Sequence, residues 1–195
     1  MKDFKFDKRA ASYDDGFEGK ASQKFYNLLL REAALQPGAV VLDVGCGTGA
    51  LLGRLDSAFG IIGYGVDVEE NMIAQARAKH PAMRFSVAPC GQLPFENQTF
   101  DVIVACMAYH HFDDKEGFAR EAARVLKPGG VLYIADPRFP WLFRKIMNGI
   151  LRLVRIVGEF LTAQEMEARF AAYGFTGIGA AADAYAQVVK LQRKG

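Results

Sequence analysis

Short runs of apolar residues alternate along the chain with longer segments in which apolar residues recur every three or four positions. The short runs lack the length of a helix and are typical of strands buried on both faces. We expect five such strands, at 39–42, 61–66, 84–88, 100–106 and 131–135. The periodic segments predict helices at 22–35, 50–59, 69–80, 114–126 and 162–173. Strands that alternate with helices predict a parallel sheet with helices on both faces.

The pattern changes toward the carboxyl end of the chain. Residues 176–181 and 185–191 are separated by a short polar turn and predict a hairpin, whose strands run antiparallel. The expected fold is therefore α/β, with a mostly parallel, seven-stranded sheet that ends in an antiparallel C-terminal hairpin.

The composition fits one soluble globular domain. The chain has 195 residues, 51% of them hydrophobic, and its formal net charge of +2 argues against a strongly basic nucleic-acid binder. The spacing of Cys46, Cys90 and Cys106 suggests neither a disulfide framework nor a zinc site, which favours a reducing, intracellular setting. The first residues contain no apolar core of signal-peptide length, and no run of about 18 uncharged apolar residues occurs. We therefore expect a cytoplasmic protein.

Candidate chemistry begins at the carboxyl end of the first expected strand. Asp43 is followed at alternate positions by Gly45, Gly47 and Gly49, which remove side chains that would keep a ligand from the backbone. Asp67 ends the second strand, eighteen positions after Gly49. A carboxylate there can accept both hydrogens of a ribose diol. A tight strand-to-helix turn would also use glycines, but the pairing with Asp67 favours a nucleoside-containing cofactor.

The glycine spacing distinguishes between classes of cofactor. Nicotinamide enzymes typically carry G-x-G-x-x-G, whereas this chain has G-x-G-x-G preceded by an acid two residues earlier. In this it resembles the class I S-adenosylmethionine-dependent methyltransferases, which implies a Rossmann-like, doubly wound sheet. Tyr13-Asp14 also resembles the start of small-molecule members, including the quinone-biosynthesis C-methyltransferases. The likeness continues through 65–67, 93–95, 100–103 and 124–130.

The resemblance implies that the chain binds S-adenosylmethionine and releases S-adenosylhomocysteine. Gly45 and Gly47 would let the main chain approach the methionine portion and the ribose. Asp43 would organise the loop, and Asp67 would bind the ribose hydroxyls. The implied cofactor contacts are Tyr13, Asp43, Gly45, Cys46, Gly47, Gly49, Asp67, Val68, Met72, Cys90, Gly91, Gln92 and Met107.

The adenine side of this implied site departs from the family pattern. Val68 and Met72 would pack on the ring, for which a thioether is suited, although ordinary helix-sheet packing is an alternative. Family members often carry an aspartate after the third strand that binds the adenine amino group, but Pro89 stands there. The main chain at 90–91 or the side chain of Gln92 would have to supply that contact.

Acceptor chemistry is expected beyond the fourth strand, in residues 107–114. This segment lacks the Asn/Asp-Pro-Pro-Tyr motif with which related enzymes methylate the amino groups of bases, so no nucleic-acid substrate is expected. His110 and His111 are candidate general bases, because imidazole titrates near neutral pH; packing beside the cofactor or capping a loop is the alternative. Asp113 and Asp114 would complete a metal site with them, but adjacent positions rarely point at one ion, and no metal is expected.

From 138 to 157 every charged residue is basic. Steps of four, four and three place Arg144, Asn148, Arg152 and Arg155 on one helical face and leave a broad apolar surface. The segment is interpreted as a substrate lid, as a core-packing helix with solvated arginines, or as a peripheral contact with an anionic membrane. We divide the single methyltransferase domain, 1–195, into an N-terminal helical cap (1–37), a cofactor-binding core (38–137), the basic amphipathic lid or insert (138–160) and a C-terminal helix with hairpin (161–195).

These features predict methyl transfer by in-line displacement to a small, apolar or aromatic acceptor. The sulfonium donor carries the chemistry, so no catalytic triad is needed. Two alternatives remain open. One is a non-catalytic cofactor-binding or interaction protein that retains the fold, for which Pro89 is the best support. The other is a nicotinamide-dependent oxidoreductase. The oligomeric state is left open.

Overall fold

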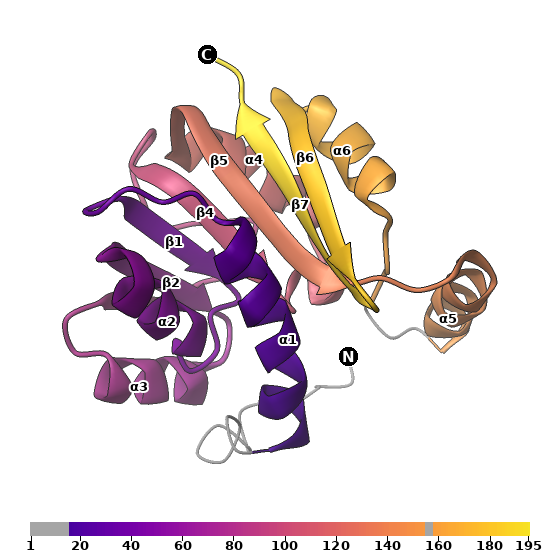
Figure 1. The fold of residues 1–195 in the computed structure, drawn as a ribbon, viewed down its shortest axis with the longest axis horizontal. Helices are drawn as coiled ribbons and strands as arrows, with labels where there is room; N and C mark the ends of the chain where they lie inside the picture. Colours follow the sequence, from indigo (N-terminus) through magenta and orange to yellow (C-terminus); the bar gives the residue numbers. More distant parts are fainter. Residues whose placement is uncertain (1–15, 155–157) are drawn as a thin grey trace.

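One seven-stranded sheet, with strand order β3-β2-β1-β4-β5-β7-β6, organises the computed structural model, which describes residues 16–154 and 158–195 (Figure 1). Strands β1 to β5 are paired in parallel, whereas β7 pairs antiparallel with both β5 and β6. The expected Rossmann-like sheet with an antiparallel C-terminal hairpin is confirmed. The strands are β1 (Val40–Val44), β2 (Ile62–Asp67), β3 (Arg84–Val87), β4 (Phe100–Cys106), β5 (Leu126–Pro137), β6 (Phe175–Asp183) and β7 (Ala186–Arg193).

Helices cover both faces of this sheet. The neighbours Val41 and Leu42 in β1 point to opposite faces. Val41 shares a buried cluster with Phe25 and Leu52, and Leu42 shares the other with Phe118. Apolar residues are therefore needed at every position of β1, which explains its unbroken apolar run. The helices are α1 (Phe17–Glu32), α2 (Ala50–Phe59), α3 (Glu70–Lys79), the 3-10 helix η2 (Tyr109–His111), α4 (Lys115–Val125), α5 (Trp141–Leu153) and α6 (Ala163–Ala171). Within residues 16–154 and 158–195, no helix combines the length and apolarity needed to cross a membrane.

The first helix is displaced from its predicted position at 22–35. The structure ends α1 before Ala33, which is extended with φ −75° and ψ 131°. The N–H of Ala34 then donates to the hydroxyl of Tyr133 at 3.3 Å. Because the backbone leaves the helix here, Leu35 is buried from an extended segment rather than from a helical turn.

The fifth strand is longer than the predicted 131–135. Its ladder begins with Leu126 opposite Phe100 of β4 and ends with Pro137 opposite Ala186 of β7. The register with β4 shifts just after Phe100, so the Pro-Gly-Gly sequence expected to close a helix lies inside the strand as an irregularity. Pairing with a neighbour on each side extends β5 beyond the apolar run that predicted it.

The insert after β5 forms α5, which lies to one side of the sheet near the end of β5 (Figure 1). The expectation of a core-packing helix with solvated arginines is wrong for its described part. Arg144 is 8% exposed, whereas Leu142 and Leu153 are 61% and 83% exposed. The side of α5 that meets the protein therefore carries the polar Arg144, whereas the apolar Leu142 and Leu153 face solvent. Arg155 lies outside the described residues.

Candidate active site

The glycine-rich turn after β1 is held by the carboxylate of Asp67. Gly45, Gly47 and Gly49 have φ angles of 78°, 52° and 78°, in the left-handed region that favours glycine. Oδ2 of Asp67 accepts a hydrogen bond from the N–H of Gly47 at 2.9 Å, and Oδ1 accepts one from the N–H of Glu69 at 3.0 Å. A carboxylate offers about four acceptor sites, so Asp67 can shape the loop and still accept from a ligand.

Asp43 is buried beside this loop, and one of its two side-chain oxygens lacks a hydrogen-bond partner among the described residues. The residue is 2% exposed, and the oxygen without such a partner is Oδ1. Burial, with a smaller effect from the carboxylate of Asp67, raises the pKa of Asp43 to about 8. The side-chain hydrogen bond to the N–H of Gly47 in this loop comes from Asp67, and the loop-organising role of Asp43 stays a prediction. A buried, unpaired carboxylate is costly, and a ligand that carries positive charge would relieve that cost.

The variant Asp43→Asn is expected to gain stability relative to the wild type as the pH rises. The folded protein keeps the Asp43 proton up to about pH 8, whereas the unfolded chain loses it near the ordinary value of 3.8. Between these values the folded state binds more protons, so the free energy of unfolding of the wild type falls with rising pH. Asparagine removes this dependence, and the advantage of the variant should grow by up to about 5 kcal/mol from pH 4 to pH 8. Urea unfolding across this range measures it.

A matched control is Asp56→Asn, because Asp56 is exposed on α2. The stability of this control should follow the wild-type pH dependence. Parallel curves for Asp43→Asn and the wild type would contradict the raised pKa of Asp43.

Gly45 brings the loop against the segment that follows β4. A β-carbon built on Gly45 would lie 2.5 Å from Cβ of Ala108, a distance that real β-carbons essentially never show. The two segments come from neighbouring strands, because β1 pairs with β4. This contact joins the glycine loop to residues 107–112, where acceptor chemistry is expected.

The variant Gly45→Ala should lose about 2–4 kcal/mol of unfolding free energy. This loss adds the cost of an alanine in the left-handed conformation to the cost of the overpacked contact with Ala108. Gly38→Ala is a matched control, because Gly38 has a φ of 79° and no atom within 4 Å of a built β-carbon. It should lose only the conformational part, about 1–2 kcal/mol. Urea unfolding of both variants separates the two effects, and equal losses would contradict the close approach.

His110 forms a buried pair with Asp136 at the end of β5. Nδ1 of His110 lies 2.9 Å from Oδ1 of Asp136, and the two side chains are 6% and 2% exposed. The ring of Phe160 stacks on His110 with centroids 5.2 Å apart and an interplanar angle of 23°. Because the carboxylate engages Nδ1, Nε2 is the ring nitrogen left to exchange a proton.

Asp136 was not identified from the sequence. It is 26 positions from His110, and only the pairing of β4 with β5 brings the two side chains together. A signal was present, because Asp43, Asp67 and Asp136 each follow an apolar run at the carboxyl end of a strand. The same rule that identified the first two would have identified the third.

Two other residues expected after β4, Met107 and His111, lie on either side of 108–110. Met107 has a φ of 54°, unusual for a residue other than glycine, and its N–H donates to the carbonyl of Ala135 at 2.8 Å. This bond fixes the turn out of β4. His111 is exposed, and its ring centroid lies 4.0 Å from that of His110.

The turn that carries three of the expected adenine contacts, Cys90, Gly91 and Gln92, begins beside Asp67. The N–H of Ala88 donates to the main-chain carbonyl of Asp67 at 3.0 Å, which brings the turn after β3 beside the end of β2. Val68 is 61% exposed and Met72 is 3% exposed, so Val68 is the apolar side chain available to a ligand. In the turn, Cys90 is buried, Gly91 is partly buried and Gln92 is exposed. Tyr13 lies outside the described residues.

Neither a metal cluster nor a reactive thiol accompanies this site. In the described ranges, no group of three or more His, Cys, Asp or Glu residues is placed to hold a metal ion. Burial raises the thiol pKa of Cys90 to about 11 and those of Cys46 and Cys106 well above their usual range. The candidate chemistry of the site therefore rests on other groups than a thiolate, among them the carboxylates and the imidazoles described above.

Comparisons with known sequences identify a matching family model and related proteins. Residues 42–134 match the family model described as "Methyltransferase domain". The chain is 37% identical over 105 residues to the 2-methyl-6-phytyl-1,4-hydroquinone methyltransferase of a Synechocystis species, covering 52% of this chain and 33% of that protein. It is 37% identical over 100 residues to the demethylmenaquinone methyltransferase of Chlorobaculum parvum, covering 51% of this chain and 42% of that protein. The matched part therefore spans less than half the length of either relative.

Solved structures share the fold. A methyltransferase in complex with the Haloferax volcanii Trm112 activator aligns with a TM-score of 0.87 and 20% identity over 100% of both chains. The phosphoethanolamine N-methyltransferase 2 of Haemonchus contortus, in complex with S-adenosyl-L-methionine, aligns with a TM-score of 0.70 and 21% identity over 90% of this chain and 43% of that chain.

Proposed function

This chain belongs to the class I S-adenosylmethionine-dependent methyltransferases, and from that membership we propose that it transfers a methyl group to a small, apolar or aromatic acceptor by in-line displacement. The observation that carries the proposal is the glycine loop with two carboxylates beside it. Asp67 offers acceptor lone pairs at the end of β2, and Asp43 is a buried carboxylate with an unpartnered oxygen. The loop thus suits a ligand with a ribose and a positive charge.

These residues fit S-adenosylmethionine. In the proposed arrangement, Gly45 and Gly47 leave the backbone open to the ligand, Asp67 accepts from the ribose hydroxyls, and Asp43 faces the cationic amino-acid portion. When bound, the cofactor supplies a methyl group already activated by a sulfonium. The protein's own task is then to hold the acceptor in line and to exclude water. Cys46, Gly49, Val68, Met72, Cys90, Gly91, Gln92 and Met107, together with Tyr13, complete the proposed cofactor contacts.

The acceptor side is proposed to lie around His110. Asp136 holds Nδ1 of His110, which orients Nε2 to take a proton from a hydroxyl, amine or activated carbon. Phe160 stacks on His110, and Phe139 meets Phe160 edge-on with centroids 5.0 Å apart. An apolar or aromatic acceptor fits such surroundings, and two relatives carry names that refer to a hydroquinone and to demethylmenaquinone. Residues 38–137 are proposed to bind the cofactor and residues 138–160 to contribute to the acceptor side.

Calorimetry and a transfer assay test this proposal. S-adenosylhomocysteine should bind in isothermal titration, and label from methyl-tritiated S-adenosylmethionine should appear in one or more members of a panel of hydroquinones and phenols. Binding without transfer to any of the panel would favour the non-catalytic alternative. A rise of the melting temperature with NAD but not with S-adenosylhomocysteine would favour an oxidoreductase, because a ligand that binds only the folded state raises its stability.

A further inference from the structure

The helix α5 turns its apolar residues toward solvent. Leu142, Ile146, Ile150 and Leu153 follow steps of four, four and three, which places them on one helical face. Their exposed fractions are 61%, 53%, 46% and 83%. An amphipathic helix of a globular domain normally turns such a face toward the core. We call these four residues the outer face of α5.

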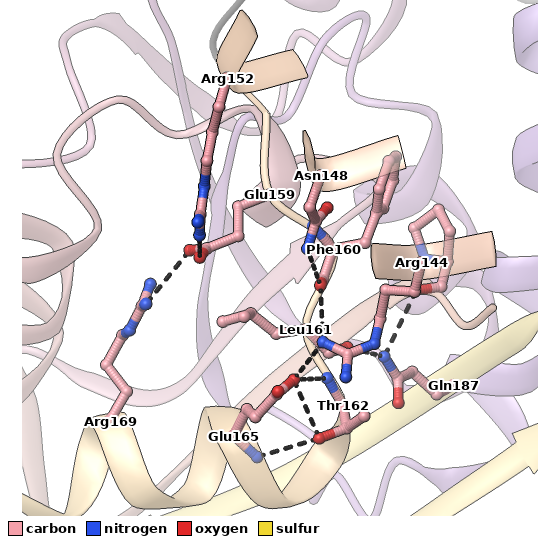
Figure 2. Close-up of polar contacts among 11 residues, drawn as sticks. Arg144, Asn148, Arg152, Glu159, Phe160, Leu161, Thr162, Glu165, Arg169 and Gln187 are labelled. Carbon is pink, nitrogen blue, oxygen red and sulfur yellow. Dashed lines mark hydrogen bonds and ion pairs between the residues drawn. The ribbon is translucent and has the colours of Figure 1, made fainter. Parts of the chain in front are cut away.

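Polar contacts hold α5 in this orientation (Figure 2). Nη1 of Arg144 lies 2.6 Å from Oε2 of Glu165 and also donates to the carbonyl of Phe160 at 3.3 Å. Asn148 donates to the same carbonyl and accepts from the N–H of Phe160, both at 3.0 Å. Turning the outer face inward would break these bonds. It would also expose the buried guanidinium group of Arg144, which now pairs with Glu165. The bonds of Arg144 and Asn148 therefore fix the orientation in which the outer face of α5 points to solvent.

Basic side chains border the outer face. Between 138 and 157 the sequence has no acidic residue, and the exposed cations there include Arg138, Lys145 and Arg152. Helical spacing places Lys145 and Arg152 along one border of the outer face. Trp141 is 67% exposed at the start of α5, with Nζ of Lys145 6.0 Å from its ring centroid. An apolar face with a tryptophan and a basic border is the pattern of helices that lie in a membrane interface.

We propose that α5 docks on an anionic lipid surface, with the outer face in the boundary between headgroups and acyl chains and the cations at lipid phosphates. Each cation near such a surface contributes attraction that falls off within a Debye length. Charge also disfavours a second copy of the chain as the occupant. Two such helices face to face would bring the exposed Lys145 of each copy toward that of the other, with no acid between 138 and 157 to compensate, whereas Arg152 is already paired with Glu159 at 3.5 Å. This inference does not depend on the proposed methyl transfer.

Trp141 is the single tryptophan of the chain and so reports directly on α5. Vesicles of phosphatidylcholine with phosphatidylglycerol should shift its emission to shorter wavelength and should co-sediment the protein. Vesicles of phosphatidylcholine alone should do so at least about tenfold more weakly, and added salt should weaken the anionic binding. Brominated acyl chains in the anionic vesicles should quench the emission.

Variants separate the outer face from the rest of the surface. Ile146→Glu and Leu153→Glu should each lower the affinity for anionic vesicles about tenfold or more, because each places a carboxylate in the apolar face. Ile178→Glu is a matched control, since Ile178 is 49% exposed on β6, and it should bind as the wild type does. S-adenosylhomocysteine affinity should be the same in all of them, which shows that the cofactor site is intact.

Three outcomes would overturn the proposal. The first is an unchanged Trp141 spectrum with anionic vesicles. The second is equal vesicle binding by the wild type and both α5 variants. The third is a dimer in sedimentation velocity that Ile146→Glu dissociates, without vesicle binding by the wild type, because that result would make a second copy the occupant of the outer face.

Discussion

Replacing Asp67 with alanine is expected to lower the affinity for S-adenosylhomocysteine by about a hundredfold to a thousandfold. Hydrogen bonds to a charged group are worth about 1.5–3 kcal/mol each, so two to a ribose diol are worth about 3–6 kcal/mol. The lower part of that range, about 3–4 kcal/mol, is a hundredfold to a thousandfold, since 1.4 kcal/mol is tenfold in affinity. The variant also loses the acceptors for the N–H groups of Gly47 and Glu69. Isothermal titration of the wild type and the variant measures the change.

A ligand without the diol separates ribose binding from loop shaping. If Asp67 binds the ribose, Asp67→Ala should cost little affinity for the 2′,3′-dideoxy analogue of S-adenosylhomocysteine. The loss of affinity caused by the substitution should then be larger for S-adenosylhomocysteine than for this analogue, as in a double-mutant cycle between side chain and diol. Asp67→Asn keeps one acceptor oxygen and should lie between the wild type and Asp67→Ala. Equal losses for both ligands would reject the ribose contact, and an unchanged affinity would reject the site.

Much of the fold was predictable because the sheet is covered on both faces. That burial demands continuous apolar runs, and the bounds of α2 and β4 were predicted without error from such patterns. The errors occur where a tertiary contact overrides the local pattern. The chain leaves α1 early where Ala34 bonds to Tyr133, and β5 is extended by its pairing with β7.

The candidate site was predictable as far as its residues are close in sequence or belong to a motif. The glycine loop and Asp67 were identified in this way, whereas the pairing of His110 with Asp136 depends on β4 lying beside β5. The orientation of α5 was predicted least well. A helical wheel shows that one face is apolar and the other polar, but only the contacts of Arg144 and Asn148 show which face meets the protein.

The contacts of α5 also connect it to the candidate acceptor side. Phe160 is bonded to Asn148 of α5 and stacks on His110. The N–H of the neighbouring Glu159 donates to the main-chain carbonyl of His110 at 3.0 Å. A helix that docks on lipid would thus hold the wall of the acceptor region close to the surface from which an apolar acceptor is drawn.

The variant Asp136→Asn is expected to reduce the methyl-transfer rate by about a hundredfold or more, which is the usual contribution of general acid–base catalysis. An asparagine amide can donate a hydrogen bond to Nδ1 of His110, which favours the tautomer that carries its proton on Nε2. In that tautomer Nε2 has no free lone pair and cannot accept a proton from the acceptor substrate. His110→Gln should cost as much, and the ascending limb of the pH–rate profile should disappear in both variants.

Two readouts distinguish a positioning role of Asp136 from a merely structural one. S-adenosylhomocysteine affinity should stay within about twofold of the wild type, because neither side chain belongs to the proposed cofactor contacts. Long-range ¹H–¹⁵N spectra are tractable because the chain has 3 histidines, and in Asp136→Asn the His110 ring should change from the Nδ1–H to the Nε2–H tautomer. A slowed variant with an unchanged tautomer would contradict positioning by Asp136. A changed tautomer with an unchanged rate would contradict the use of His110 as the base.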